Sequence, residues 1–185
     1  TIEVFYKNYK DRTLLLLAGD IQPLDESSCY EFCDQILDVM EGASGKKEII
    51  TLGGIAMDKN PKTPKVYCTA NNHSIKKKYG NKLVNGGMYG LVGPIVGVSG
   101  LLVGLAGKRK IPAIAFLAET YGHPNFLGIR SAREILKVLN EKLKLKLKLE
   151  DLDEEIANIE RLNTGYKRMK KLKTAAMNKD LNYIG

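Results

Sequence analysis

Seven residues of this 185-residue sequence combine side-chain type and position in a way that suits ligand binding or catalysis. Most of them follow apolar runs that predict buried strands, and the set consists of Asp20, Gln22, Gly53, Gly54, Ser99, Glu119 and Thr120. In an open parallel sheet, ligands bind beyond the carboxyl ends of the strands, so these residues are expected to converge on one pocket. Two carboxylates beside glycines would suit a hydrolase or a ligase. Acidic residues are also ordinary helix caps and loop formers, so we predict a pocket and assign no catalytic residue.

Two catalytic motifs are excluded by their spacing. The run 97–101 reads Gly-Val-Ser-Gly-Leu, so Leu101 stands where the nucleophile elbow G-x-S-x-G needs its second glycine. No strand pattern directly precedes Ser99, and His123 is the only histidine that follows it. A phosphate-binding loop is absent as well, because Gly107-Lys108 is followed by Arg109 and the glycine spacing does not match. The sequence therefore lacks the signatures of a serine hydrolase and of a P-loop enzyme.

Three cysteines and two histidines give little support for a metal or redox site. Cys29 and Cys33 are four residues apart, one more than the C-x-x-C motif requires, and Cys68 lies far from both. We therefore predict buried thiols in a reducing cytoplasm, with no metal and no cofactor.

Basic residues exceed acidic ones by 29 to 21, which gives a formal net charge of +8, and many of them lie near the C-terminus. The basic cluster 167–173 could contact phosphates or an acidic protein surface. Proteins that bind single-stranded nucleic acid interleave aromatic residues with basic ones, and here only Tyr166 is adjacent. A solvated helix face is therefore favoured, and nucleic-acid binding is kept as an alternative.

Strand and helix patterns alternate along the chain, which predicts an α/β fold with a mostly parallel sheet and helices on both faces. Residues 2–9 alternate as in a half-exposed strand, whereas 13–18 is wholly apolar, as in a strand buried on both faces. Further strands are predicted at 48–52, 65–69 and 112–117, with a tight turn at 53–54. Helices are predicted from Ser27 or Ser28 to about Met40, over 72–79, and from Ser131 to about Leu143.

Glycines recur every three or four residues in one uncharged stretch, at positions 90, 93, 97, 100, 104 and 107. In a helix that begins near Pro94 they would share one face. Because each interior glycine costs roughly 1 kcal/mol of helix stability relative to alanine, this face is expected to pack closely against another element. We favour the sheet as that element, with an oligomer contact or a pocket lining as alternatives. The proline and the glycines also argue against a membrane span over 91–107, so no membrane association is predicted.

The C-terminal third of the chain has a different pattern. Residues 1–143 are predicted to form the α/β core, 144–173 an amphipathic helical extension, and 174–185 a flexible tail. Within the extension, apolar residues recur at steps of three and four from Leu152 to Met169. This apolar stripe is expected to pack on the core or on another chain.

Four ordered motifs resemble those of the proteasome assembly chaperone 2 family. They are the run AGDIQP at 18–23, the pair Gly53-Gly54 after a strand, the run GVSGLL at 97–102 and the run ETYG at 119–122. The resemblance extends over residues 2–155. The family usually opens with a further strand, glycine turn and helix, and this sequence does not contain that unit. Either the protein was cut or the unit lies outside this sequence, and if the folded molecule lacks it, part of the sheet is expected to be exposed.

The resemblance implies a phosphorylase-like three-layer α/β fold, homo-oligomers, and a role in assembling or engaging the proteasome. Proteasome activators often end in a hydrophobic residue, a tyrosine and one further residue, which dock between ring subunits of the proteasome. The partner-binding residues implied here are Leu181, Tyr183, Ile184 and Gly185, with Tyr183 one position farther from the end than in that motif.

We therefore predict a non-enzymatic, cytoplasmic homo-oligomer that binds other proteins, the core proteasome among them through the C-terminal tail. The first alternative is an enzyme, an ATP-grasp-like ligase or a hydrolase, with Asp20, Ser99 and Glu119 in a strand-end pocket. The second alternative is nucleic-acid binding through the basic cluster 167–173.

Overall fold

The computed structural model of the chain describes residues 2–80, 84–85, 95, 97–123, 126–150, 152–154, 156–159 and 161. In chain order, its elements are β1 (Ile2–Asn8), β2 (Thr13–Gly19), α1 (Glu26–Gly42), β3 (Ile49–Met57), β4 (Val66–Ala70), α2 (His73–Tyr79), β5 (Val84–Asn85), α3 (Val98–Lys108), β6 (Ala113–Tyr121) and α4 (Ile129–Leu143). None of the helices in these described ranges is both long and apolar enough to cross a membrane.

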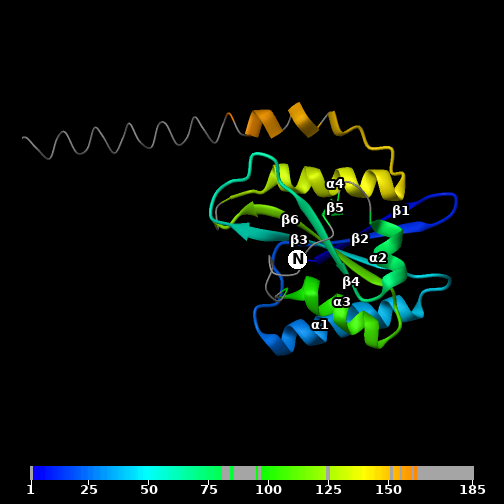
Figure 1. Cartoon of the computed structure of the whole chain (residues 1–185). Coiled ribbons are helices and arrows are strands. Elements are labelled where there is room, and N and C mark those ends of the chain that lie inside the picture. Colours follow the sequence, from blue (N-terminus) through cyan, green and yellow to red (C-terminus); the bar gives the residue numbers. More distant parts are fainter. Residues whose placement is uncertain are drawn as a thin grey trace, which may run out of the picture.

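The central sheet has four strands in the order β3-β6-β4-β5. Strand β3 runs parallel to β6, and β5 runs parallel to β4, but β4 and β6 are antiparallel. Figure 1 shows the sheet between α4 on one side and α1 with α3 on the other. The α/β class and the helices on both faces are as predicted, whereas the sheet is mixed, so the mostly parallel arrangement is not confirmed.

Strand β6 is the centre of the core, because its side chains are buried on both faces. On one face, small side chains of β6 pack under α1 and α3 in a cluster that contains Cys33, Leu37, Leu102, Val103, Ala106, Ala113 and Ala115. On the other face, larger side chains pack under α2 and α4 in a cluster that contains Ile75, Tyr79, Ile114, Phe116, Ile135, Val138 and Leu139. The apolar run 112–117 predicted such a strand, since neither face of a covered sheet meets water.

Asn71 joins three elements at the start of β6. Its Nδ2 donates to the backbone oxygens of Val103 in α3 and Ile111, at 3.3 and 2.8 Å, and its Oδ1 accepts from Ala113 N at 3.0 Å. These bonds satisfy backbone groups where the chain leaves α3 and enters the sheet. The amide therefore fixes the position of α3 on the sheet.

Strands β1 and β2 form a separate antiparallel hairpin, paired from Ile2↔Gly19 to Asn8↔Thr13. The prediction that 13–18 is buried on both faces of a parallel sheet is therefore wrong. Leu15, Leu16 and Leu17 are each about half exposed, at 51%, 51% and 48%. An apolar run favours a buried strand, but a strand is buried only where other elements pack on both of its faces. The described residues leave these leucines about half exposed.

Three local boundaries differ from the sequence prediction. Asp25, and not Ser27 or Ser28, caps α1, since its Oδ1 accepts from Ser28 N at 2.9 Å. Ser131 is buried within the first turn of α4 and donates to Glu119 O at 2.6 Å. The pair Gly53-Gly54 lies inside β3 and makes no turn. A Cβ on Gly53 would come within 2.8 Å of a Leu117 methyl group, so these glycines allow side chains of β6 to lie against β3.

The glycines of α3 do not form the main face that packs on the sheet, contrary to the prediction, although a Cβ on Gly107 would lie 3.3 Å from Asn71 Cβ, directly after β4. Helix α3 buries the opposite stripe, Leu102, Val103 and Ala106. A Cβ on Gly104 would meet open space, whereas one on Gly100 would clash with the backbone oxygen of Ile95. Close approach therefore explains Gly100, and Gly104 has no neighbour among the described residues that requires a glycine.

Residues after α4 turn back along that helix (Figure 1). Asn140 holds the turn, because its Nδ2 donates to Leu147 O at 3.0 Å and its Oδ1 accepts from Leu147 N at 2.9 Å. Arg133 Nη2 then donates to Asp153 Oδ2 at 2.7 Å, and Ile156 is buried. The described part of the extension is thus tied to α4 by an ion pair, and it buries one apolar side chain.

Candidate functional site

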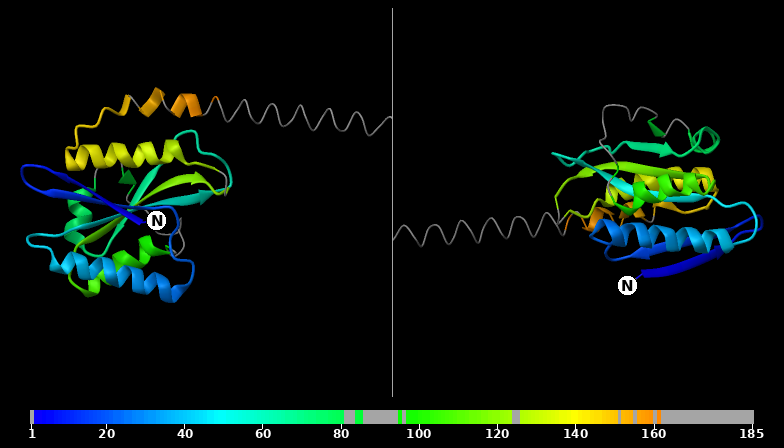
Figure 2. Two further views of the ribbon diagram at one scale, coloured as in Figure 1. Left: turned by 180° about the vertical axis from the view of Figure 1, so that it is seen from behind. Right: turned by 90° about the horizontal axis from the view of Figure 1, so that it is seen from below.

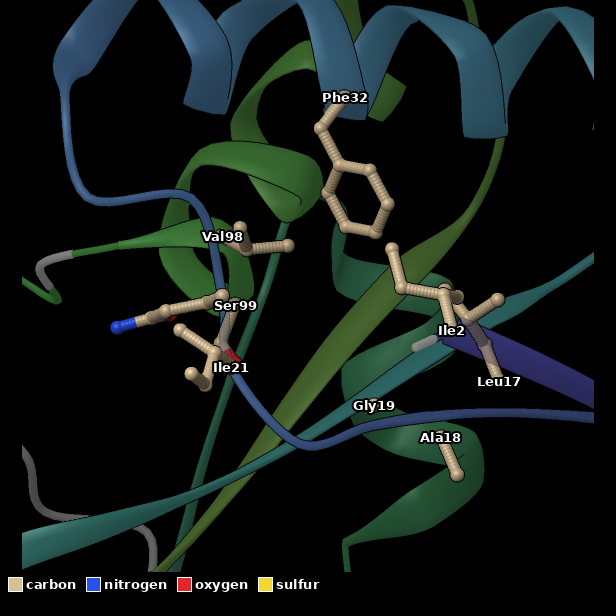
Figure 3. A pocket seen from close by; sticks show the side chains of 9 residues that line it. Ile2, Leu17, Ala18, Gly19, Ile21, Phe32, Val98 and Ser99 are labelled. Carbon is tan, nitrogen blue, oxygen red and sulfur yellow. The ribbon is translucent and has the colours of Figure 1, made fainter.

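A pocket of about 250 Å³ lies where the open end of the hairpin meets α1 and the start of α3. Figure 3 shows Phe32 descending from α1 into this space, with Ile2 and Leu17 of the hairpin on one side and Val98 of α3 on the other. The remaining lining residues are Ala18, Gly19, Ile21, Gln22 and Ser99. Among these residues, only Gln22 and Ser99 contribute polar side chains.

The two polar lining residues are engaged in local structure. Ser99 Oγ donates to Leu52 O at 3.3 Å, and Ser99 O accepts from the Thr51 hydroxyl at 3.1 Å. Gln22 lies against Gly97, whose φ is +89°, and a Cβ at that position would lie 2.9 Å from Gln22 Oε1. The described residues therefore give Ser99 no general base, and its hydroxyl donates to the backbone.

Glu119 and Thr120 lie within β6, away from the lining of this pocket. The Glu119 carboxylate accepts from the Tyr67 hydroxyl at 2.9 Å and from Lys65 N at 3.1 Å. The side chain of Thr120 lies against Gly54, where an added Cβ would be 2.8 Å from its methyl group. The Glu119 carboxylate is therefore engaged in hydrogen bonds to Tyr67 and Lys65.

The structure thus divides the seven predicted site residues into two groups. Gln22 and Ser99 line the pocket, and Asp20 lies between the lining residues Gly19 and Ile21. The other four, Gly53, Gly54, Glu119 and Thr120, lie along the paired strands β3 and β6. Binding of a ligand by either group stays a prediction.

Sequence reasoning missed the apolar side of the pocket, which Ile2, Leu17, Phe32 and Val98 provide. The available signal was the apolar run 13–18, but it was assigned to the interior of a sheet. Recognising the pocket required knowing that β2 pairs with β1 alone.

The three cysteines are free and buried, as predicted. Burial, with Cys29 and Asp34 nearby, raises the pKa of the Cys33 thiol to about 11. Such a thiol carries almost no thiolate at neutral pH and is a poor nucleophile. Among the described residues there is no group of three or more histidine, cysteine or acidic residues that could hold a metal ion.

Two sites predicted from the sequence fall outside the described residues. They are the tail residues Leu181, Tyr183, Ile184 and Gly185, and the basic cluster 167–173.

The model of the PAC2 family matches residues 1–163 of this sequence. The chain belongs to the PAC2 family. That match extends over the hairpin, the central sheet, the four helices and the start of the extension. The resemblance to the proteasome assembly chaperone 2 family that the four sequence motifs indicated is thereby confirmed.

Solved PAC2-type structures share this fold. Pyrococcus furiosus PbaB, an archaeal proteasome activator, is 26% identical with a TM-score of 0.77, and the match covers 90% of this chain and 71% of PbaB. Pyrococcus furiosus PbaA, an archaeal homologue of proteasome-assembly chaperone, is 21% identical with a TM-score of 0.69, covering 97% of this chain and 78% of PbaA. A PAC2 family protein from Streptomyces avermitilis is 18% identical with a TM-score of 0.65, covering 89% and 67%. No curated protein sequence matches the chain.

Proposed function

We propose that this protein is a non-enzymatic, homo-oligomeric, proteasome-assembly-chaperone-like protein that binds the core proteasome. The observation that carries the proposal is the family match over residues 1–163, together with the likeness to a proteasome activator at 26% identity. The function proposed here is therefore assigned from the family and not from a catalytic site. A cytoplasmic location is part of the proposal.

The geometry of the predicted site favours binding over catalysis. An enzyme needs a nucleophile or an acid–base pair with a partner in hydrogen-bond reach. Here Ser99 Oγ donates to a backbone oxygen, and the Glu119 carboxylate accepts from Tyr67 and from a backbone N–H. The pocket between the hairpin and α3 is lined mostly by apolar residues, with Gln22 and Ser99 as its polar side chains, and such a mixed lining suits recognition of a partner.

The C-terminal tail is the proposed contact with the proteasome. A tyrosine and a terminal carboxylate can dock together in a pocket that contains a lysine, because the ring is buried while the charge is paired. In this sequence Tyr183 and Gly185 would supply these two groups. The domain division into a core over 1–143, an extension over 144–173 and a tail over 174–185 belongs to the same proposal.

An affinity measurement on immobilised core proteasome tests this function. We expect the full chain to bind, and a chain that lacks residues 181–185 to lose about tenfold or more in affinity, the size of effect seen when one interface anchor is removed. The variant Asn182→Ala is the matched control, since it changes the same tail but not the proposed anchors. Equal affinity of the full and shortened chains would contradict the tail assignment, and no binding by either would contradict the proteasome as partner.

A further inference from the structure

Two lysine-rich segments meet at one end of the molecule. The first is α2, and the second is the run 142–148, in which lysines alternate with leucines where the chain leaves α4. Figure 1 and the left-hand view of Figure 2, which is turned by 180°, both place α2 and the C-terminal end of α4 on the same side of the molecule. Neither α2 nor the run 142–148 contains an acidic residue.

Lys142 joins the two segments. Its Nζ donates to Gly80 O at 3.0 Å and to Lys78 O at 3.4 Å, so the last turn of α4 lies against the C-terminal end of α2. Lys78 Nζ in turn forms an ion pair with Glu48 at 2.6 Å. Lys142 and Lys78 are therefore engaged within the chain, and their charges are largely used there.

The turn after α4 displays its lysines on an unusual backbone. Lys144 and Lys146 have φ values of +49° and +59°, the left-handed region that glycine and asparagine adopt more readily than other residues. Leu145 between them packs against the core cluster that also contains Ile75 and Tyr79 of α2. The leucine thus anchors the turn, while both lysines are exposed. Lysine at two such positions indicates that the side chains serve a purpose that the backbone alone does not require.

Four exposed lysines of these segments define what we call the basic end, namely Lys76, Lys77, Lys144 and Lys146. None of the four forms an ion pair with another described residue. Like charges gathered without counterions create a positive potential that attracts an anionic partner. The basic end is therefore complementary to a negatively charged surface.

The composition of the two segments favours carboxylates over a nucleic acid. Arginine is the usual residue for phosphate recognition, and α2 and the run 142–148 contain none. Single-stranded nucleic acid also needs exposed aromatic rings on which bases stack, but Tyr79 is only 2% exposed and neither segment contains phenylalanine or tryptophan. Lysine ammonium groups are point charges on flexible stems, which suit separate carboxylates that follow no fixed repeat.

We propose that the basic end binds an acidic segment of a partner protein, whose aspartate and glutamate side chains pair with Lys76, Lys77, Lys144 and Lys146. This inference goes beyond the proposed function, which assigns the contact with the proteasome to the C-terminal tail. It gives the folded core a second interaction surface, one that depends on charge and not on an apolar anchor.

Neutralising the basic end tests the proposal. The probe is a fluorescently labelled peptide of about ten glutamates, and its binding to the full chain is followed by fluorescence anisotropy. In the variant Lys77→Gln/Lys144→Asn/Lys146→Asn we expect the affinity to fall by about fivefold or more, because three exposed ion pairs are lost. Failure of the unmodified chain to bind the peptide, or equal affinity of the variant, would overturn the proposal.

The matched control removes the same charge elsewhere. The variant Lys170→Gln/Lys171→Gln/Lys173→Gln lowers the net charge by the same amount within the basic cluster 167–173. We expect its affinity for the peptide to stay within about twofold of that of the unmodified chain, since net charge alone would act equally in both variants. An equal loss in the two variants would show that the peptide responds to overall charge, and would overturn the assignment to the basic end.

Two other polyanions decide the class of partner. A single-stranded oligonucleotide and vesicles that contain phosphatidylserine are titrated against the unmodified chain and the basic-end variant. We expect the variant to lose more affinity for the glutamate peptide than for either of them. An equal or larger loss for the oligonucleotide or for the vesicles would overturn the choice of an acidic protein segment.

The backbone of the turn gives a readout that separates binding from stability. Asparagine fits the left-handed region better than lysine does, so Lys144→Asn/Lys146→Asn should keep or raise the melting temperature while it weakens peptide binding. A fall of more than about 5 °C would show that these lysines stabilise the fold, and would contradict their assignment to binding.

The peptide experiments involve neither the proteasome nor the tail, so the two proposals can fail separately. Deleting residues 181–185 should leave peptide binding unchanged. Loss of peptide binding on that deletion would overturn the basic end as a separate surface, whereas a chain that binds the peptide but not the proteasome would keep the basic end and remove the proposed partner of the tail.

Discussion

The hydroxyl of Tyr67 in β4 lies 2.9 Å from Oε1 of Glu119 in β6, and donates a hydrogen bond to it. Oε2 of the same carboxylate accepts from Lys65 N at 3.1 Å. The two bonds tie the antiparallel pair β4–β6 together near the end of β6. Glu119, which the sequence predicted as a residue of the pocket, therefore stabilises the sheet.

Replacing Glu119 tests this structural role. In Glu119→Gln one acceptor oxygen becomes an amide donor that faces the Tyr67 hydroxyl or the Lys65 N–H. We expect the free energy of unfolding to fall by about 1–3 kcal/mol, the cost of leaving a partly buried polar group without its partner. Urea denaturation measures this change, with Glu31→Gln on the exposed side of α1 as the control. Loss of proteasome binding with unchanged stability would show that Glu119 acts in function.

Alkaline pH should destabilise the protein through two buried tyrosines. Burial first, and then the hydrogen bond to Glu119, raises the pKa of Tyr67, and burial with a bond to Glu48 raises the pKa of Tyr79. A raised pKa means that the unfolded chain loses the phenolic proton at lower pH than the folded chain. The stabilisation is therefore complete below the ordinary pKa of about 10 and falls as the pH rises above it.

Thermal melts between pH 8 and 11 measure this dependence. We expect Tyr67→Phe to reduce the loss of melting temperature above pH 10, since phenylalanine has no proton to release. Tyr30→Phe on α1, where the tyrosine is exposed, should leave the pH dependence unchanged. An equal slope in the unmodified chain and Tyr67→Phe would contradict this assignment.

The glycines of α3 should respond to alanine in opposite directions. Gly104→Ala adds a methyl group in open space and improves helix propensity, so we expect a gain of roughly 0.5–1 kcal/mol. Gly100→Ala forces its Cβ against the Ile95 backbone oxygen, so we expect a loss of about 1–3 kcal/mol. Guanidinium denaturation compares the two variants directly. Destabilisation by Gly104→Ala that appears only at high protein concentration would instead place that glycine in an oligomer contact.

The sequence was sufficient to predict the elements of the core. Apolar runs identified β6, and the apolar periodicity of 131–143 identified α4, because local patterns carry that information. The register between strands was harder, since the antiparallel pairing of β4 with β6 depends on contacts between distant residues. The end of β3 was misplaced because Gly53-Gly54 reads as a turn unless the neighbouring Leu117 and Thr120 are known to lie against it.

The candidate site was predictable only in part for the same reason. Gln22 and Ser99 were identified from their types, and both line the pocket. The apolar lining from Ile2 and Leu17 depends on the hairpin, which an apolar run such as 13–18 does not distinguish from a strand inside a covered sheet. The exposure of Val4 and Tyr6 likewise could not be predicted from the sequence, because it depends on which of the described residues lie beside β1.

Native mass spectrometry of the full chain mixed with the core proteasome of its own organism tests the central claim most directly. The account predicts a complex whose mass equals that of the core proteasome plus whole copies of this chain, and its disappearance when residues 181–185 are deleted. A spectrum that shows only free proteasome and free, folded protein at concentrations well above micromolar would contradict the claim that this PAC2 family member acts by binding the proteasome.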